Sequence, residues 1–212
     1  MIDHYSSWLK QPMVSIDVET TGLDHKNERV VELGLVRIEG GVVVEKWSSL
    51  LNPGKPIPRE VSNIHGIFDR DVEGQPKFVH VMESALRILR DAIPVAYNAD
   101  FDQKFIWEEA YRCGVYNTLS HIPALDPNFP WIDPMVWSRH FHGNNGRGEN
   151  TLGRSCERHG ISIKDAHRAG DDAEACGKLL LAMSEKIGIE QTFGQIIMRQ
   201  RDIKATRGAR RQ

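Results

Sequence analysis

Cysteine is scarce in this chain, with three residues among 212. Cys113, Cys156 and Cys176 are far apart, and no two of them form a CxxC pair. An odd number of isolated cysteines argues against a disulfide framework and against a structural zinc site. Because free thiols persist in a reducing compartment, we expect a cytoplasmic protein.

Long hydrophobic runs and a secretory leader are also missing. No apolar stretch approaches the roughly 18 residues that a membrane-spanning helix needs. The first ten residues, MIDHYSSWLK, contain no basic segment followed by an apolar one. We therefore expect neither export nor association with a membrane.

An excess of charge of one sign is absent as well. The chain has 27 Lys and Arg residues against 29 Asp and Glu residues, for a net charge of −2. This near-neutral balance lacks the strong basic field of a protein that coats duplex nucleic acid. With 40% hydrophobic and 26% charged residues, the composition is typical of a globular domain and excludes a wholly disordered chain.

Along the chain, short apolar runs typical of strands alternate with segments whose apolar residues are spaced as in helices. Strand patterns occur at residues 13–18, 30–39, 42–51 and 94–98, with a weak one at 129–135. Gly40-Gly41 separates the second and third runs and predicts a β-hairpin. Helices are predicted at 77–92, 101–113, 151–158 and 171–187. This order predicts one mixed α/β domain.

Two carboxylates lie in the first predicted strand. Alternation places Asp17 and Glu19 on the same face, near the end of the strand. Adjacent carboxylates repel each other, and a divalent cation that prefers hard oxygen ligands, Mg²⁺ or Mn²⁺, would compensate them. The alternative interpretation is a strand edge that faces solvent.

Two later segments also carry acidic residues where a strand or loop gives way to a helix. Asp100 and Asp102 follow the fourth strand, where open α/β sheets place their sites. His167 precedes Asp171 and Asp172 across a glycine. Each segment alone is explained equally well by helix capping and the helix dipole.

The three segments together predict a metal-assisted reaction. In this β/α order they can converge on one edge of the sheet, where two metal ions about 4 Å apart would hold the attacking and leaving oxygens of a phosphodiester. An unperturbed imidazole titrates near neutrality, so His167 is suited to take a proton from the attacking water. The residues therefore predict hydrolysis of a phosphodiester.

The segments IDVETTGLD, YNADFDQKFI and HRAGDDAEA resemble, in order, the three motifs of the DEDDh 3′–5′ exonuclease family. That family includes the epsilon proofreading subunit of bacterial DNA polymerase III and RNase T. The likeness covers about residues 13–183. It implies an α/β, RNase H-like fold with a central five-stranded mixed sheet flanked by helices. The exonuclease domain would span residues 1–190, and residues 191–212 would form a C-terminal extension with a basic tail.

The resemblance also implies a role for each motif residue. Asp17 would bridge two Mg²⁺ or Mn²⁺ ions. Glu19 and Asp172 would complete the shell of the first ion, and Asp102 would support the second, directly or through water. His167 would be the general base. The family spacing selects Asp172 and Asp102 over the neighbouring aspartates.

Substrate contacts follow from the same likeness. Thr20, Thr21 and Leu23 match the loop that receives the 3′-terminal nucleotide, with Leu23 as an apolar wedge against a base. His65 lies in an I-H-G-I segment that places it near this nucleotide, and Phe101 would line the base pocket. Packing in the core is the alternative role for Leu23 and Phe101.

The function implied is removal of nucleotides from the 3′ ends of single-stranded or frayed DNA, with release of nucleoside 5′-monophosphates. One alternative is an RNase T-like 3′–5′ exoribonuclease. A further alternative is a non-catalytic module that binds nucleic acid or associates with a polymerase. Proofreading would require a DNA polymerase partner, for which the segment after Ile187 is the first candidate docking site. The basic tail would grip a phosphate backbone or remain a solvated terminus.

Overall fold

The computed structural model describes residues 2–3, 5–115, 119, 121–143, 146 and 148–209, the side chains of 207–209 excepted. Within these ranges, no helix has the length and apolar character that crossing a membrane requires. Residues 210–212 of the basic tail lie outside the described residues. The cytoplasmic location stays a prediction.

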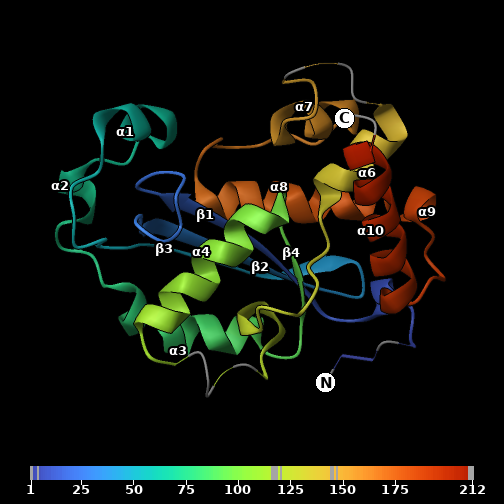
Figure 1. The fold of residues 1–212 in the computed structure, drawn as a ribbon, viewed down its shortest axis with the longest axis horizontal. Helices are drawn as coiled ribbons and strands as arrows, with labels where there is room; N and C mark the ends of the chain where they lie inside the picture. Colours follow the sequence, from blue (N-terminus) through green and yellow to red (C-terminus); the bar gives the residue numbers. More distant parts are fainter. Residues whose placement is uncertain are drawn as a thin grey trace.

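A mixed sheet of four strands, in the order β3-β2-β1-β4, forms the centre of the fold (Figure 1). Strands β1 (Met13–Thr20), β2 (Val30–Glu39) and β3 (Val42–Leu50) are antiparallel neighbours, and β4 (Ile93–Val95) runs parallel to β1. All four correspond to strands predicted from the sequence. The parallel pair β1 and β4 brings the carboxyl ends of both strands to the same edge of the sheet.

The predicted hairpin joins β2 to β3. Glu39 pairs with Val42, so the loop consists of Gly40 and Gly41 alone. Their φ angles are 57° and 79°, which is the backbone geometry that a two-residue turn requires and that glycine adopts without strain.

The expectation of a five-stranded sheet is wrong for the described residues, because the predicted strand at 129–135 contributes only an isolated bridge between Ile132 and Val95. Pro130 and Pro134 flank this point and have no N–H to donate to a ladder. Asp133 then caps the next helix by accepting from the backbone N–H of Met135 at 3.0 Å. The chain therefore leaves the sheet after one residue.

Helices cover both faces of the sheet. They are η1 (Trp8–Lys10), α1 (Arg59–His65), α2 (Asp69–Val72), α3 (Phe78–Leu89), α4 (Ala99–Arg112), η2 (Pro123–Leu125), α6 (Pro134–His142), α7 (Leu152–Arg158), α8 (Ala169–Ala182), α9 (Ser184–Ile187) and α10 (Phe193–Ala209). The predicted helices at 77–92, 101–113 and 151–158 correspond to α3, α4 and α7. The one predicted at 171–187 is two helices, α8 and α9, separated at Met183.

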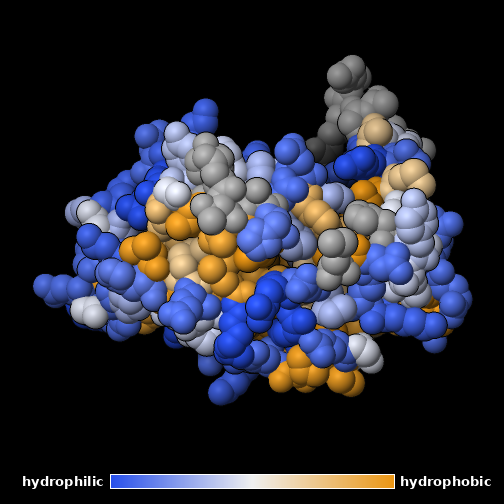
Figure 2. Space-filling model, turned by 90° about the horizontal axis from the view of Figure 1, so that it is seen from below, coloured by the Kyte–Doolittle hydropathy of each residue, from blue (hydrophilic) through white to orange (hydrophobic). Residues whose placement is uncertain are grey.

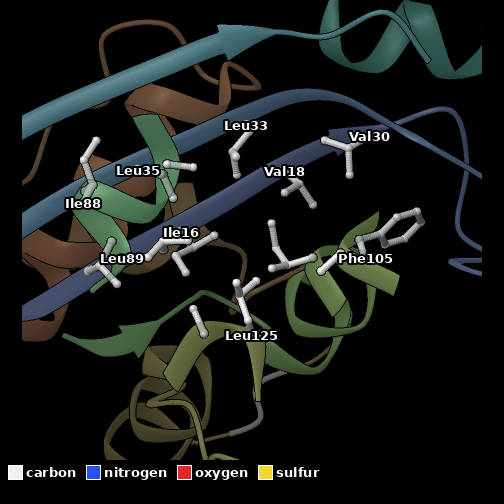
Figure 3. Packing of buried hydrophobic residues seen from close by; sticks show 14 of the residues in the cluster. Ile16, Val18, Val30, Leu33, Leu35, Ile88, Leu89, Phe105 and Leu125 are labelled. Carbon is white, nitrogen blue, oxygen red and sulfur yellow. The ribbon is translucent and has the colours of Figure 1, made fainter. Parts of the chain in front are cut away.

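Successive side chains of β1 point to opposite faces of the sheet, so the core has two layers. Val14, Ile16 and Val18 belong to the cluster that packs against α3 and α4, whereas Met13 packs with α8 and α6 on the other face. Figure 3 shows the first layer, where side chains of β1 and β2 meet Ile88 and Leu89 of α3, Phe105 of α4 and Leu125 of η2. The odd-numbered residues of β1 therefore face α8.

The first turn of α8 lies in van der Waals contact with the sheet because β2 has a glycine there. A Cβ atom at Gly34 would lie 2.2 Å from the backbone carbonyl of Ala169, a separation that real atoms do not tolerate. Gly34 is also the partner of Asp17 in β1. The missing side chain thus lets the start of α8 approach the strand that carries the first motif.

Helix α10 packs on the same core as α8 (Figure 1). Phe193, Ile196 and Ile197 are buried in the cluster that also contains Leu179 and Leu180 of α8. No helix was predicted here, because the sequence signal was a row of basic residues. The division of the chain at residue 190 stays a prediction.

Seen from below, the surface has a broad hydrophobic area left of the centre and smaller hydrophobic groups, all among hydrophilic side chains (Figure 2). Among the described residues, Leu23 is 86% exposed and Ile64 is 62% exposed. Leu23 follows β1 in the chain, and Ile64 precedes His65 in α1. Both belong to the segments that were predicted to contact substrate or adjoin them.

Candidate active site

Strand β1 places Asp17 and Glu19 on the face that α8 covers, near its carboxyl end. Both side chains are partly buried, and the pairing of β1 with β2 shifts its register between Glu19 and Thr20. Such an irregularity bends a strand and redirects the side chains next to it. The strand ends one residue after the second carboxylate, at Thr20.

The start of α8 brings two further groups to Glu19. Ligand atoms of Glu19, His167 and Asp172 all lie within 4.8 Å of one another. The backbone N–H of His167 donates to Oδ2 of Asp172 at 3.0 Å, and His167 has a φ angle of 67°. This left-handed conformation is uncommon for a residue with a side chain, and it often marks a functional site.

Helix α4 supplies Asp102 from the opposite layer. The side chain is 3% exposed, and its Oδ1 accepts a hydrogen bond from the backbone N–H of Val18 at 3.1 Å. Asp102 is therefore tied to β1 between the two carboxylates of the first motif. Asn98, which precedes α4, has a φ angle of 70°, so the chain turns sharply from β4 into the helix.

The neighbouring aspartates have other partners. Asp100 is mostly exposed and its Oδ1 lies 3.0 Å from Nζ of Lys204. Asp171 pairs with Lys46 of β3. Asp100 and Asp171 thus pair with lysines, and the choice of Asp102 and Asp172 as site residues stays a prediction.

The clustered carboxylates raise one another's pKa. Burial, followed by the charges of Asp17, Asp172 and Glu32, raises the pKa of Glu19 from 4.5 to about 9. Burial is also the first cause of the raised pKa values of Asp17, Asp102 and Asp172. These carboxylates share one cluster of unfavourable negative charge in a partly water-excluded site.

This set of groups fits a divalent cation. Hard carboxylate oxygens are the ligands that Mg²⁺ and Mn²⁺ prefer, and a cation removes the repulsion that raises these pKa values. Glu19 and Asp172 could hold one ion, and Asp17 lies beside both of them in the charge cluster. Asp102 is close enough to Asp17 for its pKa to be raised by that charge.

Glu32 of β2 belongs to the same site but was missed by the sequence analysis. It is 2% exposed and pairs with Glu19 across the strands. Its carboxylate accepts from Arg168 at 2.9 and 3.0 Å and from the backbone N–H of Ala169 at 3.1 Å. The sequence did contain a signal, a lone glutamate in the apolar run VVELGLV. A carboxylate in such a strand would be buried, and a buried carboxylate needs partners.

The two threonines that were predicted to contact substrate are buried at the end of β1 and at the start of the loop that follows it. The hydroxyl of Thr20 donates to the carbonyl of Gly22 at 2.7 Å. The hydroxyl of Thr21 bonds to Glu28 and accepts from the backbone N–H of Arg29. Both side chains therefore hold the shape of the loop.

The remaining predicted contact residues differ in exposure. Leu23 extends into solvent, whereas Phe101 is partly buried and its ring centroid lies 4.8 Å from that of Phe105. His65 is buried; its Nδ1 accepts from the backbone N–H of Ile67 at 3.0 Å, which assigns the ring proton to Nε2. Burial lowers the pKa of His65. Its Nε2 is enclosed beside the backbone of Thr20.

Comparison with known proteins identifies the family. The sequence profile of the RNase T exonuclease family matches residues 14–180. The chain belongs to this exonuclease family. Its domain is of the DEDDh 3′–5′ exonuclease type, as the three motifs indicated.

Curated relatives differ in how much of their length the chain spans. The DNA polymerase III subunit epsilon of Treponema pallidum is 30% identical over 169 residues, which is 80% of this chain and 74% of that protein. A DNA polymerase III of PolC type from Thermotoga maritima is 32% identical over 181 residues, or 83% of this chain. The match covers only 12% of that much longer polymerase.

Solved structures share the fold. An E. coli ExoI–ssDNA complex superimposes with a TM-score of 0.67 at 17% identity, over 84% of this chain and 41% of that one. The nuclease domain of 3′hExo, a DEDDh family member bound to rAMP, gives 0.65 at 15% identity over 89% and 96% of the two chains. At these identities the likeness concerns the fold.

Proposed function

We propose that this protein is a metal-dependent 3′–5′ exonuclease that removes nucleotides from single-stranded or frayed DNA ends and releases nucleoside 5′-monophosphates. The observation that carries the proposal is the cluster of Glu19, His167 and Asp172 within 4.8 Å, beside Asp17 and Asp102. The DNA polymerase III relatives favour DNA over RNA as the substrate.

Asp17, Glu19, Asp102 and Asp172 are the residues proposed to hold two Mg²⁺ or Mn²⁺ ions, with Asp17 between them. Bound there, the ions would acidify a water molecule and neutralise charge that develops on the phosphate. The protein's own contribution is to hold four carboxylates together against their repulsion. The tie from Val18 to Asp102 and the bond from His167 to Asp172 serve this purpose.

His167 is the proposed general base. Its side chain is exposed at the edge of the carboxylate cluster, so a neutral imidazole there can accept a proton from the attacking water. The water oxygen bonds to phosphorus as the bond from phosphorus to the 3′ oxygen of the preceding nucleotide breaks. That 3′ oxygen takes up a proton, which leaves a shortened strand and a nucleoside 5′-monophosphate.

Recognition of a 3′ end is assigned to the loop after β1 and to α1. The exposed side chain of Leu23 offers an apolar surface for a base. His65 would lie near the terminal nucleotide, with its buried ring against the backbone of Thr20, where it supports the loop that receives the 3′ end. Phe101 would line the pocket through its partly exposed ring.

The test uses a 5′-labelled single-stranded DNA oligonucleotide with Mg²⁺ and an RNA of the same sequence. The wild-type protein should produce a ladder that shortens from the 3′ end, faster on DNA. Asp17→Asn should lower the rate by at least about 10³-fold and remain folded. Asp202→Asn, which removes an equivalent charge at an exposed position of α10, should have no effect.

Each alternative corresponds to a distinct result of this assay. A strong preference for RNA would assign the protein to exoribonucleases. Binding of both strands by folded protein without cleavage, in Mg²⁺ and in Mn²⁺, would indicate a non-catalytic module. Full activity of Asp17→Asn would reject the assigned metal site.

We also propose association with a DNA polymerase, because a relative over most of this chain is a DNA polymerase III epsilon subunit. If it occurs, the purified chain should elute together with a replicative polymerase catalytic subunit in gel filtration. Separate elution at micromolar concentrations would argue against a stable complex.

A further inference from the structure

We infer that α10 is a brace of the active site, in which Gln200 and Lys204 are positioning residues for the start of α4 and hence for Asp102. The inference rests on the proposed function for its kinetic consequences. It concerns a helix at residues 193–209, beyond the family match that ends at residue 180.

Gln200 is joined to the segment that leaves the sheet. Its side chain is buried, and its Oε1 accepts from the backbone N–H of Asp133 at 2.8 Å and from Nε1 of Trp137 at 3.2 Å. Its Nε2 donates to the carbonyl of Trp131 at 2.9 Å. One amide thus satisfies the backbone on both sides of Ile132, where a further strand would otherwise pair.

The braced segment in turn holds the second motif. Ile132 exchanges backbone hydrogen bonds with Pro94 and Ala96, at the end of β4, at 3.0 and 3.1 Å. Oδ1 of Asp133 accepts from the backbone N–H of Asn98 at 3.1 Å. Because Asn98 adopts a left-handed backbone conformation as the N-cap of α4, this bond helps fix where the helix begins, one turn before Asp102.

Lys204 balances the negative charges of Asp133 and Asp100 where the braced segment meets α4. Its Nζ lies 3.7 Å from Oδ2 of buried Asp133 and 3.0 Å from Oδ1 of Asp100. Among the described residues, Lys204 is the cation that forms an ion pair with Asp133. Removing it would leave a buried carboxylate without its charged partner, so that the residues bonded to Asp133 shift or its carboxyl takes up a proton.

The competing role for Lys204 is contact with the phosphate backbone of substrate, as the sequence suggested for the basic tail. The two roles differ in what they alter. A positioning residue affects turnover and metal binding, whereas a phosphate contact affects substrate affinity in a salt-dependent way. Arg201, an exposed residue of the same helix, is a matched control for the loss of one positive charge.

The experiment compares full-length wild type with Lys204→Met, Lys204→Arg, Gln200→Leu and Arg201→Ala. We expect Lys204→Met and Gln200→Leu to lower kcat about 10-fold or more and to raise the half-saturating Mg²⁺ concentration. KM for the oligonucleotide should change less than about 3-fold. Lys204→Arg should restore most of kcat, and Arg201→Ala should leave kcat unchanged.

Amide hydrogen exchange provides a readout that does not depend on activity. Without substrate, exchange at Asn98 and through the first turn of α4 should be faster in Lys204→Met and Gln200→Leu than in wild type or Arg201→Ala. Should Gln200→Leu fail to fold, Lys204→Met still decides, because its side chain is only partly buried.

The proposed positioning role of α10 is rejected if Lys204→Met retains the wild-type kcat and the wild-type rate of hydrogen exchange in α4. It is also overturned if Lys204→Met raises only KM, with the same salt dependence as Arg201→Ala. An inactive wild-type protein would reject the proposed function, and the exchange comparison would still support or reject the brace.

Discussion

Glu32 and Arg168 form a two-bonded ion pair that links the second strand to the residue after the proposed base. Nε and Nη2 of Arg168 donate to the carboxylate at 3.0 and 2.9 Å, and the backbone N–H of Ala169 adds a third bond. Glu19 is the partner of Glu32 across the strands. The pair therefore anchors His167 and the start of α8 beside the first motif.

Replacement of Glu32 by Gln should separate positioning from folding. The amide keeps one acceptor for the N–H of Ala169 but loses the charge that pairs with Arg168. We expect kcat to fall about 10- to 100-fold, with little change in KM for the oligonucleotide. Glu39→Gln, on the exposed end of the same strand, is the control in steady-state kinetics. Equal rates for the two variants would contradict the positioning role.

Gly34→Ala tests the close approach of α8 to β2. The added Cβ would lie 2.2 Å from backbone atoms of Ala169, so α8 or the strand must move. We expect a loss of at least about 2 kcal/mol in the free energy of unfolding, measured in urea, together with lower activity. Gly153→Ala in α7, where a Cβ meets nothing within 4 Å, should be neutral or stabilising by up to about 1 kcal/mol. Similar stability of both variants would show that α8 does not need this contact.

Glu19→Gln should stabilise the metal-free protein at alkaline pH. The folded-state pKa of Glu19, about 9, exceeds its ordinary value of 4.5. Its contribution to stability is therefore fully present below about pH 4.5 and is lost as the pH rises toward 9. In EDTA at pH 8, the variant should melt about 3–8 °C above wild type, and this difference should shrink toward pH 5.

The control and the metal response complete this test in a thermal shift assay. Glu83→Gln, an exposed change on α3, should melt like wild type at both pH values. Mg²⁺ should raise the melting temperature of wild type more at pH 8 than at pH 5, because protons compete for the same carboxylates. A difference in melting temperature between Glu19→Gln and wild type that grows as the pH falls would contradict the raised pKa of Glu19.

Leu23→Ala should weaken substrate binding without affecting the fold. The side chain is 86% exposed, so its truncation should change stability by less than about 0.5 kcal/mol. Loss of an apolar surface for a base should raise KM for a single-stranded oligonucleotide about 5- to 10-fold. Val42→Ala, an exposed change at the far end of the sheet from Thr20, is the control. An unchanged KM for Leu23→Ala would remove Leu23 from the proposed contact surface.

Much of the architecture was predictable because its signals are local. Gly40-Gly41 between two β-rich runs indicated the hairpin, and the spacing of apolar residues located α3, α4 and α7 to within a few residues. The expectation of a fifth strand failed because a run such as FPWIDPM carries no sign of how many residues will pair. Only the contact of Ile132 with β4 and the immediate capping of α6 by Asp133 show that the pairing stops after one bridge.

By itself, the sequence determined the residue types, their order and the alternation that puts Asp17 and Glu19 on one face. These properties depend only on neighbours along the chain, so they can be read from the three short motifs. Tertiary structure alone decided that Glu32 holds Arg168 and that Gln200 and Lys204 reach the segment at Asp133. These pairs lie far apart in the chain, so no spacing rule predicts them. A buried polar group takes its partners from whatever elements the fold brings beside it.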